Sequence, residues 1–272
     1  MKEKISLAGD LGSGKSTVSA ILIERMGAEY YSTGAIVRDI AAKRGMSVVE
    51  LNVYMETHPE IDHEIDDGLC ALADIDKLLI IDSRLAWHFT PGTFKVYLST
   101  DIETSALRIM CANRCGEHAS SLEDTIKDTR SRRNSEKKRY MEQYGLNIKD
   151  LSNYDLIVDT TNATPDEVAD AIMAAFERWQ IDRSYRALLI TPERLKYPDI
   201  PSDPTLMSEY SSRLDMGDAV AEVLVTEDEG DFYLVDGLES ALAYSFNMNT
   251  FIPATLVKAE HTGEYIQMKN SL

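Results

Sequence analysis

Residues able to bind phosphate stand close to the N-terminus, in the glycine-rich segment Gly9–Thr17. Its spacing, G-x-x-x-x-G-K-S, is that of a phosphate-binding P-loop. The glycines let the backbone curl so that N–H groups point at phosphate oxygens, Lys15 would reach the β- and γ-phosphates, and the Ser16 hydroxyl would bind Mg²⁺. The segment therefore predicts ATP and Mg²⁺ as cofactors. The expected nucleotide contacts are Gly9, Gly12, Ser13, Gly14, Lys15, Ser16 and Thr17.

Hydrogen-bonding groups for a phosphoryl acceptor follow the first predicted helix. Ser32 and Thr33 can hydrogen-bond a sugar or a base, and Arg38, on the next helix, can bind a monophosphate through two parallel hydrogen bonds. We therefore expect Ser32 and Arg38 to bind the acceptor. The alternative is that Ser32 only caps a helix and that Arg38 is an ordinary surface residue.

A second pair of charged residues follows the apolar strand Leu78–Ile81. Ligands of doubly wound sheets bind beyond the carboxyl ends of the strands, which is where Asp82 and Arg84 stand. Asp82 is expected to hold Mg²⁺ together with Ser16 and to act in catalysis with Lys15, and Arg84 is expected to bind the acceptor phosphate. The alternative is that Asp82 caps the next helix and Arg84 lies on the surface.

Basic residues are concentrated in one segment of the chain. Nine of the 21 basic residues within residues 1–181 lie there: Arg108, Arg114, Lys127, Arg130, Arg132, Arg133, Lys137, Lys138 and Arg139. Positioned arginines stabilise the charge of phosphoryl transfer, and a closing lid excludes water. The segment is therefore predicted to be a lid, with Arg132 in catalysis and acceptor binding and Arg114 at the nucleotide. The alternative is a solvated helix face with i,i+4 ion pairs to Glu136 and Asp128.

The same segment contains Cys111, Cys115 and His118, spaced as C-x3-C-x2-H. These side chains could bind zinc, but the spacing supplies no clear fourth ligand, and the two cysteines could simply share a helix face. The chain has three cysteines, too few for a disulfide scaffold. This number favours a reducing cytoplasm.

Alternating strand and helix patterns over about the first 180 residues predict a parallel sheet with covering helices. The expected strands are Ile5–Ala8, Glu29–Tyr31, Leu78–Ile81, Phe94–Leu98 and Leu156–Val158. One helix is expected over Leu122–Tyr144, and another after a capping box of Thr164 and Glu167 with Pro165 between them. The predicted fold class is α/β: a P-loop parallel sheet with covering helices and a helical lid, plus a small α+β C-terminal domain.

The pattern changes near residues 180–184, so we predict two domains, residues 1–181 and 182–272. The second domain should contain strands at Arg186–Ile190 and Ala254–Val257, a helix start at Thr191–Glu193, a hairpin of Ala221–Val225 with Phe232–Val235, and a helix at Leu238–Phe246. Because the first domain already holds every element that the chemistry needs, we expect the second to be dispensable for phosphoryl transfer. It would pack on the first or form a homodimer.

Charge and hydropathy exclude several classes of partner. The chain has 28 basic and 46 acidic residues, a net charge of −18, which argues against general binding to nucleic acid or anionic lipid. No apolar run is long enough to cross a bilayer, and the N-terminus carries no apparent signal peptide. A cytoplasmic protein with a small-molecule substrate, and with neither nucleic-acid nor membrane partners, is expected.

Together these residues resemble the cytidylate kinase-like family of P-loop nucleoside monophosphate kinases, over about residues 3–178. The marks are Gly12–Thr17, Tyr31–Gly34 with Arg38, Ile61-Asp62 with Ile65-Asp66, Ser83–Ala86, Arg132 with Ser135–Tyr140, Tyr144-Gly145 and Tyr154–Thr160. The resemblance implies Mg²⁺-dependent transfer of the ATP γ-phosphoryl group to a nucleoside monophosphate, CMP or dCMP first. Ala35 and Arg133 stand where the family often has an acidic residue, which leaves the base specificity and the acceptor class open.

The C-terminal part more weakly resembles the ParB/sulfiredoxin-like fold, through Leu189–Leu195, Ala221–Val225, Phe232–Gly237, Ala241–Ala243 and Ile252–Ala254. That family has a basic pair or His-Arg after the glycine, whereas Leu238 and Glu239 follow Gly237 here. The difference argues against DNA partitioning. Two alternatives to a nucleoside monophosphate kinase stay open: a P-loop kinase for another small acceptor, and a nucleotide sensor with little turnover. Lys15, Asp82, Arg84 and the lid arginines favour an enzyme.

Overall fold

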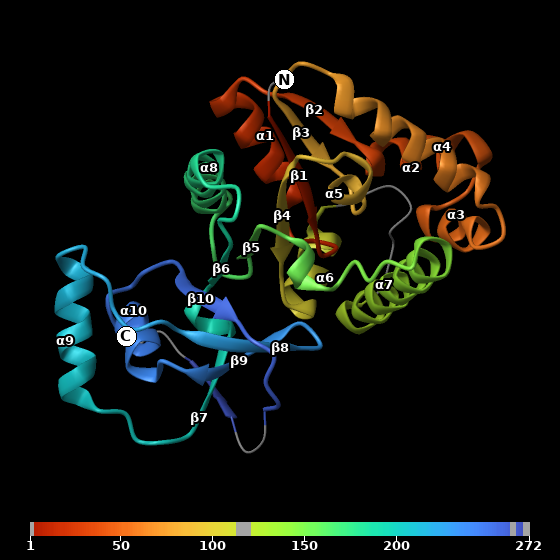
Figure 1. Cartoon of the computed structure of the whole chain (residues 1–272). Coiled ribbons are helices and arrows are strands. Elements are labelled where there is room, and N and C mark those ends of the chain that lie inside the picture. Colours follow the sequence, from red (N-terminus) through yellow and green to blue (C-terminus); the bar gives the residue numbers. More distant parts are fainter. Residues whose placement is uncertain (1–2, 113–120, 262–264, 269–272) are drawn as a thin grey trace.

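The computed structural model describes residues 3–112, 121–261 and 265–268 (Figure 1). The strands are β1 (Lys4–Gly9), β2 (Glu29–Ser32), β3 (Leu79–Asp82), β4 (Phe94–Ser99), β5 (Leu156–Asp159), β6 (Ala187–Ile190), β7 (Leu195–Pro198), β8 (Leu224–Asp228), β9 (Asp231–Asp236), β10 (Ile252–Leu256) and β11 (Tyr265–Gln267). Within this part of the chain they form one sheet in the order β11-β7-β9-β8-β10-β6-β5-β4-β1-β3-β2.

Helices surround this sheet. They are α1 (Lys15–Met26), α2 (Thr33–Arg44), α3 (Val48–Met55), α4 (Glu60–Ala71), α5 (Ala86–Phe89), α6 (Ile102–Cys111), α7 (Leu122–Tyr144), α8 (Pro165–Ile181), α9 (Pro204–Asp215) and α10 (Leu238–Phe246), with single 3₁₀ turns at Leu72–Asp74, Leu151–Asn153 and Pro192–Arg194. No helix among the described residues combines the length and the apolar character needed to span a membrane.

Six neighbouring strands make the P-loop half of the sheet. β2, β3, β1, β4, β5 and β6 pair in parallel in that order, which confirms the predicted α/β class. Parallel pairing brings the carboxyl ends of these strands to one edge of the sheet. The P-loop after β1, Asp82 at the end of β3 and Asp159 at the end of β5 therefore stand along the same edge.

Successive side chains of these strands enter two different cores. In β4, Val96 and Leu98 pack with α1 and α8 on one face, whereas Tyr97 points to the other face. This is the two-residue period of a strand. Phe176 and Trp179 supply the apolar face of α8, as its sequence pattern predicts, and its capping box is formed by Thr164 and Glu167.

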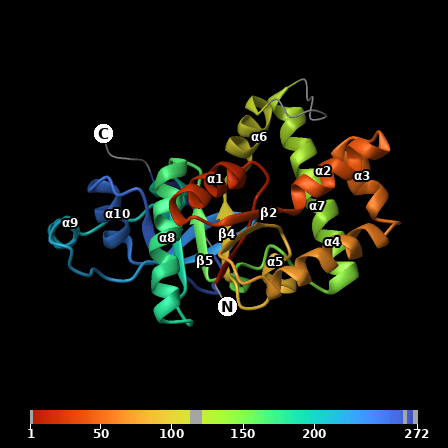
Figure 2. The same cartoon turned by 90° about the horizontal axis from the view of Figure 1, so that it is seen from above.

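The C-terminal part of the chain packs on the second face of β4, β5 and β6. β5 pairs with β6, so the sheet continues across the predicted boundary at residue 181, and β10 then runs antiparallel to β6, with Ala254 opposite Leu188. Tyr97 and Ile157 lie in the same buried cluster as Phe232. Figure 2 shows α9 and α10 at the end of the molecule opposite α2, α3 and α4.

The sequence predicted most elements of the C-terminal part, with three differences. The helix Leu238–Phe246 is confirmed at its bounds, but the helix start at Thr191 gives only a single 3₁₀ turn, because Leu195 already enters β7. The helix Pro204–Asp215 was not predicted, although Asp203 caps it and Pro204 fits its first position. Ala254–Val257 is not the last strand, since β11 follows.

Candidate active site

The P-loop is pressed against its neighbours so closely that two of its glycines have no room for a side chain. A Cβ on Gly9 would lie 2.4 Å from the carbonyl oxygen of Leu98, and one on Gly12 would lie 2.5 Å from that of Ser105. Both glycines also have positive φ, +146° and +73°, a region that other residues rarely adopt. The loop therefore has the tight backbone curl that phosphate binding requires.

Lys15 lies inside this curl. Its ammonium group donates hydrogen bonds to the carbonyl oxygens of Gly9 (3.0 Å) and Asp10 (2.7 Å) and to the Ser13 hydroxyl (3.3 Å). Burial lowers the Lys15 pKa to about 8, and the nearby Asp82 carboxylate partly opposes this effect. In this position Lys15 can exchange its backbone carbonyl partners for the oxygens of a phosphate bound by the loop N–H groups.

The two predicted magnesium ligands lie at the ends of adjacent elements. Ser16 is exposed in the first turn of α1, and Asp82 ends β3, which pairs with β1. One Asp82 carboxylate oxygen accepts a hydrogen bond from the Tyr30 hydroxyl (3.0 Å), and the side chain remains partly exposed. A hydroxyl and a carboxylate are the kinds of oxygen ligand that Mg²⁺ takes beside nucleotide phosphates, so these residues fit the role.

A cavity of about 350 Å³ adjoins the helix end of the P-loop. Its wall opposite the loop is formed by Arg108, which donates to the carbonyl oxygens of Thr160 (2.7 Å) and Thr161 (3.2 Å). The loop side of the cavity consists of Gly12, Ser13, Gly14, Ser16 and Thr17. This cavity brings together most of the predicted nucleotide contacts. Arg114, Cys115 and His118 lie outside the described residues.

Most of the predicted acceptor residues line a narrow cavity of about 90 Å³, which shares Gly12 and Ile109 with the cavity just described. Arg38, Arg84 and Arg132 all line it, together with Thr33 and Gly34 from the start of α2. Ser32 is the N-cap of that helix, accepting a hydrogen bond from the Ala35 N–H (3.3 Å). The Ser32 hydroxyl therefore caps α2, which was the alternative interpretation, and Thr33 lines the cavity instead of Ser32.

One buried carboxylate, that of Glu136 in α7, holds two of these cations. Glu136 Oε2 lies 2.5 Å from Arg84 Nε, and Glu136 Oε1 lies 3.2 Å from Arg132 Nε. Burial would raise the pKa of Glu136, but the two guanidinium groups lower it overall. The i,i+4 pair expected for a solvated helix face is therefore present, but it lies inside the acceptor cavity.

Two further carboxylates line the same cavity from α4. Asp62 is 5% exposed, with one oxygen 3.3 Å from Arg139 Nε, and Asp66 accepts a hydrogen bond from the Tyr144 hydroxyl. Burial raises the pKa of Asp62 to about 6, against the effect of Arg139. These carboxylates are among the family marks in the sequence, but only the fold shows that they face the arginines across one cavity.

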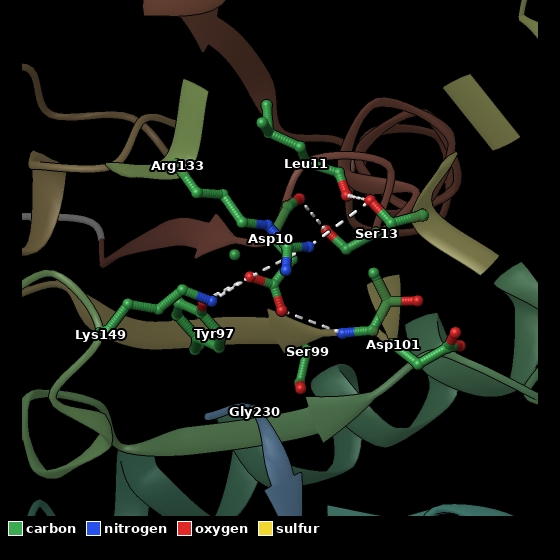
Figure 3. Close-up of polar contacts among 12 residues, drawn as sticks. Asp10, Leu11, Ser13, Tyr97, Ser99, Asp101, Arg133, Lys149 and Gly230 are labelled. Atoms are coloured by element: carbon green, nitrogen blue, oxygen red, sulfur yellow. Dashed lines mark hydrogen bonds and ion pairs between the residues drawn. The ribbon is translucent and has the colours of Figure 1, made fainter. Parts of the chain in front are cut away.

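Another buried carboxylate, that of Asp10, belongs to the P-loop itself. Asp10 accepts hydrogen bonds from the Tyr97 hydroxyl (3.0 Å), the Thr100 N–H (3.1 Å) and the Lys149 ammonium group, and Arg133 Nη2 lies 3.6 Å away. Burial would raise its pKa, but Lys149 and Arg133 bring it down to about 2. Figure 3 shows Lys149 and Arg133 pointing at Asp10 from different segments.

Sequence reasoning did not assign Asp10 and Lys149. An acidic residue in a phosphate-binding loop is itself a signal, because it needs nearby cations if it is not to repel the ligand. Arg133, which departs from the family pattern, is one of those cations. Among the described residues, no group of three or more His, Cys, Asp and Glu side chains could hold a metal ion, and Cys111 is exposed.

Comparisons with known proteins point to one family. Residues 4–162 match the cytidylate kinase-like family. A cytidylate kinase of Thermoplasma volcanium is 37% identical over 197 residues, which make up 71% of this chain and 98% of that protein. A cytidylate kinase of Thermoplasma acidophilum is 36% identical over 197 residues, 71% of this chain and all of that protein.

Two other similarities cover parts of the chain. An S-adenosylmethionine-dependent nucleotide dehydratase of Lacinutrix mariniflava is 34% identical over 179 residues, 65% of this chain and 37% of that protein. Among solved structures, a shikimate kinase of Bacteroides thetaiotaomicron superposes with a TM-score of 0.47 at 11% identity, over 64% of this chain and 98% of that one.

Proposed function

The chain belongs to the cytidylate kinase-like family and is a kinase, and we propose that it transfers the γ-phosphoryl group of ATP to CMP or dCMP. The proposal combines the family with the predicted roles of Lys15, Asp82, Arg84 and Arg132. Relatives named as cytidylate kinases support the acceptor class.

The observation that carries the proposal is the order of charges along the acceptor cavity. Arg132 and Arg139 stand two turns apart on α7, which is about 10 Å along the helix axis. Arg132 belongs to the arginine pair that could bind a monophosphate, whereas Arg139 lies beside Asp62. A carboxylate accepts hydrogen bonds well from the exocyclic amino group of cytosine. A molecule with a phosphate at one end and an amino group at the other matches this order.

The residues would act as follows. ATP with Mg²⁺, held by the P-loop, Ser16 and Asp82, supplies the phosphoryl group and part of the charge neutralisation. Lys15 leaves its carbonyl partners for phosphate oxygens. Arg84 and Arg132 exchange Glu136 for the acceptor phosphate, which would place the acceptor beside the P-loop. Closure of α7 over the site would exclude water.

A screen of acceptors tests the proposal. Release of ADP by the full chain is measured with CMP, dCMP, UMP, AMP, and representative amino acids and sugars. We expect the highest kcat/KM with CMP or dCMP, and we expect the Asp62→Asn variant to lose the preference for CMP over UMP. Equal activity with UMP and CMP, or turnover only with an acceptor that is not a nucleotide, would refute it.

A further inference from the structure

A third cavity, of about 750 Å³, lies behind the P-loop and is closed by the C-terminal part of the chain. Gly9–Leu11 form one wall, and Arg130, Arg133 and Lys137 of α7 form a second. The turn of the β8–β9 hairpin, Glu227–Gly230, forms a third. Figure 1 shows this hairpin reaching toward α7. The C-terminal part thus touches the space next to the nucleotide-binding loop.

The hairpin turn is fixed in this position by a buried arginine. Arg194 donates to the carbonyl oxygen of Gly230 (2.5 Å) and pairs with Asp231 (3.0 Å), while its Nε lies 3.4 Å from Asp159 Oδ1 at the end of β5. Arg194 is 6% exposed and Asp159 is fully buried. The turn is therefore tied to the same sheet edge that carries the P-loop.

Lys149, Asp10 and Glu227 all line this cavity. Lys149 donates to Asp10 of the P-loop, and it also interacts with Glu227 of the hairpin. Glu227 accepts a hydrogen bond from the Gly230 N–H (2.6 Å), which closes the turn. Burial raises the pKa of Glu227, the Gly230 N–H and Lys149 lower it, and Asp228 and Asp10 raise it, which agrees with the placement of Lys149, Asp10 and Glu227 around one cavity.

We propose that Lys149 and Glu227 are positioning residues that set the charge and the placement of the P-loop, so that the C-terminal part of the chain takes part in binding the donor nucleotide. The backbone carbonyl of Asp10 accepts a hydrogen bond from Lys15, and the Asp10 carboxylate accepts one from Lys149. Without Lys149, Asp10 would keep only Arg133 as a cation, and the carboxylates of Asp10 and Glu227 would share one cavity beside a loop that must bind phosphates. The inference rests on the proposed function only for the identity of the donor.

The test is a titration of the full chain with a fluorescent ADP analogue in the presence of Mg²⁺. Lys149→Met should weaken binding about tenfold, because the buried Asp10 carboxylate loses one of its two cations, and Lys149→Arg should restore most of it. Adding Glu227→Gln to Lys149→Met should recover roughly threefold in affinity, since one of two opposed negative charges is removed. Glu229→Gln, which removes the same charge from the exposed end of the turn, is the matched control and should recover less than Glu227→Gln.

The double variant separates an electrostatic role from a structural one. If Glu227 served only to close the turn, Lys149→Met with Glu227→Gln would bind no better than Lys149→Met alone, and the inference would be overturned. If Lys149→Met does not fold, as judged by thermal melting, Glu227→Lys in the native background replaces it. It should bind ADP more tightly, with a stronger salt dependence, and weaker binding would refute the inference.

Binding of ADP requires no acceptor, so the two proposals can fail separately. A chain that binds ADP but phosphorylates no monophosphate would refute the proposed function and leave this inference standing. Lys149 variants that bind ADP normally and lose only acceptor affinity would refute the inference and leave the proposed function standing.

Discussion

Two regions flank the P-loop, and each has one buried carboxylate that holds two cations. On the acceptor side, Glu136 lies between Arg84 and Arg132. On the hairpin side, Asp10 lies between Lys149 and Arg133. The two arrangements use the same charges, but they differ in what else holds the carboxylate.

Asp10 has two neutral partners in addition to its cations, the Tyr97 hydroxyl and the Thr100 N–H. Among the described residues, the Glu136 carboxylate is held by two cations, Arg84 and Arg132. A carboxylate held only by cations can be replaced by another anion, such as a substrate phosphate, at little cost in hydrogen bonds. We therefore expect Glu136 to be a replaceable counter-ion and Asp10 to be a permanent anchor.

The largest expected effect concerns Lys15. The carboxylates of both regions act on it, since Asp10 and Glu136 each raise its pKa. Lys15→Ala should lower kcat by a factor of about 100 to 1000, roughly 3–4 kcal/mol of transition-state stabilisation, without a loss of thermal stability. Lys43→Ala, which alters an exposed lysine on α2, is the control. Unchanged ATP-dependent turnover in Lys15→Ala would mean that the reaction takes place away from the P-loop, and the two flanking regions would then not belong to the active site.

The anchor role of Asp10 should be visible in stability. Its pKa is about 2 in the folded chain against an ordinary value of 3.8, so its ionised form stabilises the fold by about 2 kcal/mol above pH 4. A lowered pKa means that this contribution is lost as the pH falls toward 2, and roughly half should remain at pH 3. Urea unfolding of the native chain and of Asp10→Asn at pH 7 and pH 3 measures it. If the native chain and Asp10→Asn were equally stable at pH 7, Asp10 would not be a structural anchor and would not differ from Glu136 in this respect.

The counter-ion role of Glu136 should be visible in substrate affinity. Arg84→Lys keeps the charge but loses the planar pair of donors, so the KM for the acceptor should rise about tenfold while the KM for ATP changes less than about twofold. Steady-state kinetics with each substrate varied in turn give both values. An equal rise in the two constants would mean that Arg84 supports the whole site rather than the acceptor phosphate.

The smallest expected effect is a pH dependence on the acceptor side. The Asp62 carboxyl has a pKa of about 6, raised by burial and by Asp66 and lowered by Arg139 and His63. Its ionised form accepts hydrogen bonds from an amino group more strongly than its protonated form does. The KM for CMP should therefore rise about fourfold between pH 7.5 and pH 5.5, as the carboxylate becomes protonated. The Asp62→Asn variant should show no such change, and an unchanged profile in the native chain would remove Asp62 from base recognition.

Local sequence signals were enough to predict the features that depend on neighbours along the chain. The P-loop motif, the helix Leu122–Tyr144 between Ser121 and Gly145, and the capping box of Thr164 could be read because caps, glycines and apolar periods act within a few residues. The sequence also predicted Arg38, Arg84 and Arg132 as acceptor residues from their positions after predicted strands and helices, and the fold brings these three to one cavity.

The pairing of charged side chains from distant segments could be seen only in the folded structure. Lys149 binds Asp10 across 139 residues, and nothing near either position indicates the other. The continuation of the sheet from β6 to β10 is equally remote from local signals, and it places Phe232 in one core with Tyr97. The physical reason is that burial selects partners: a carboxylate that leaves water needs a cation wherever the fold brings one, whereas caps and periods are satisfied within a single element.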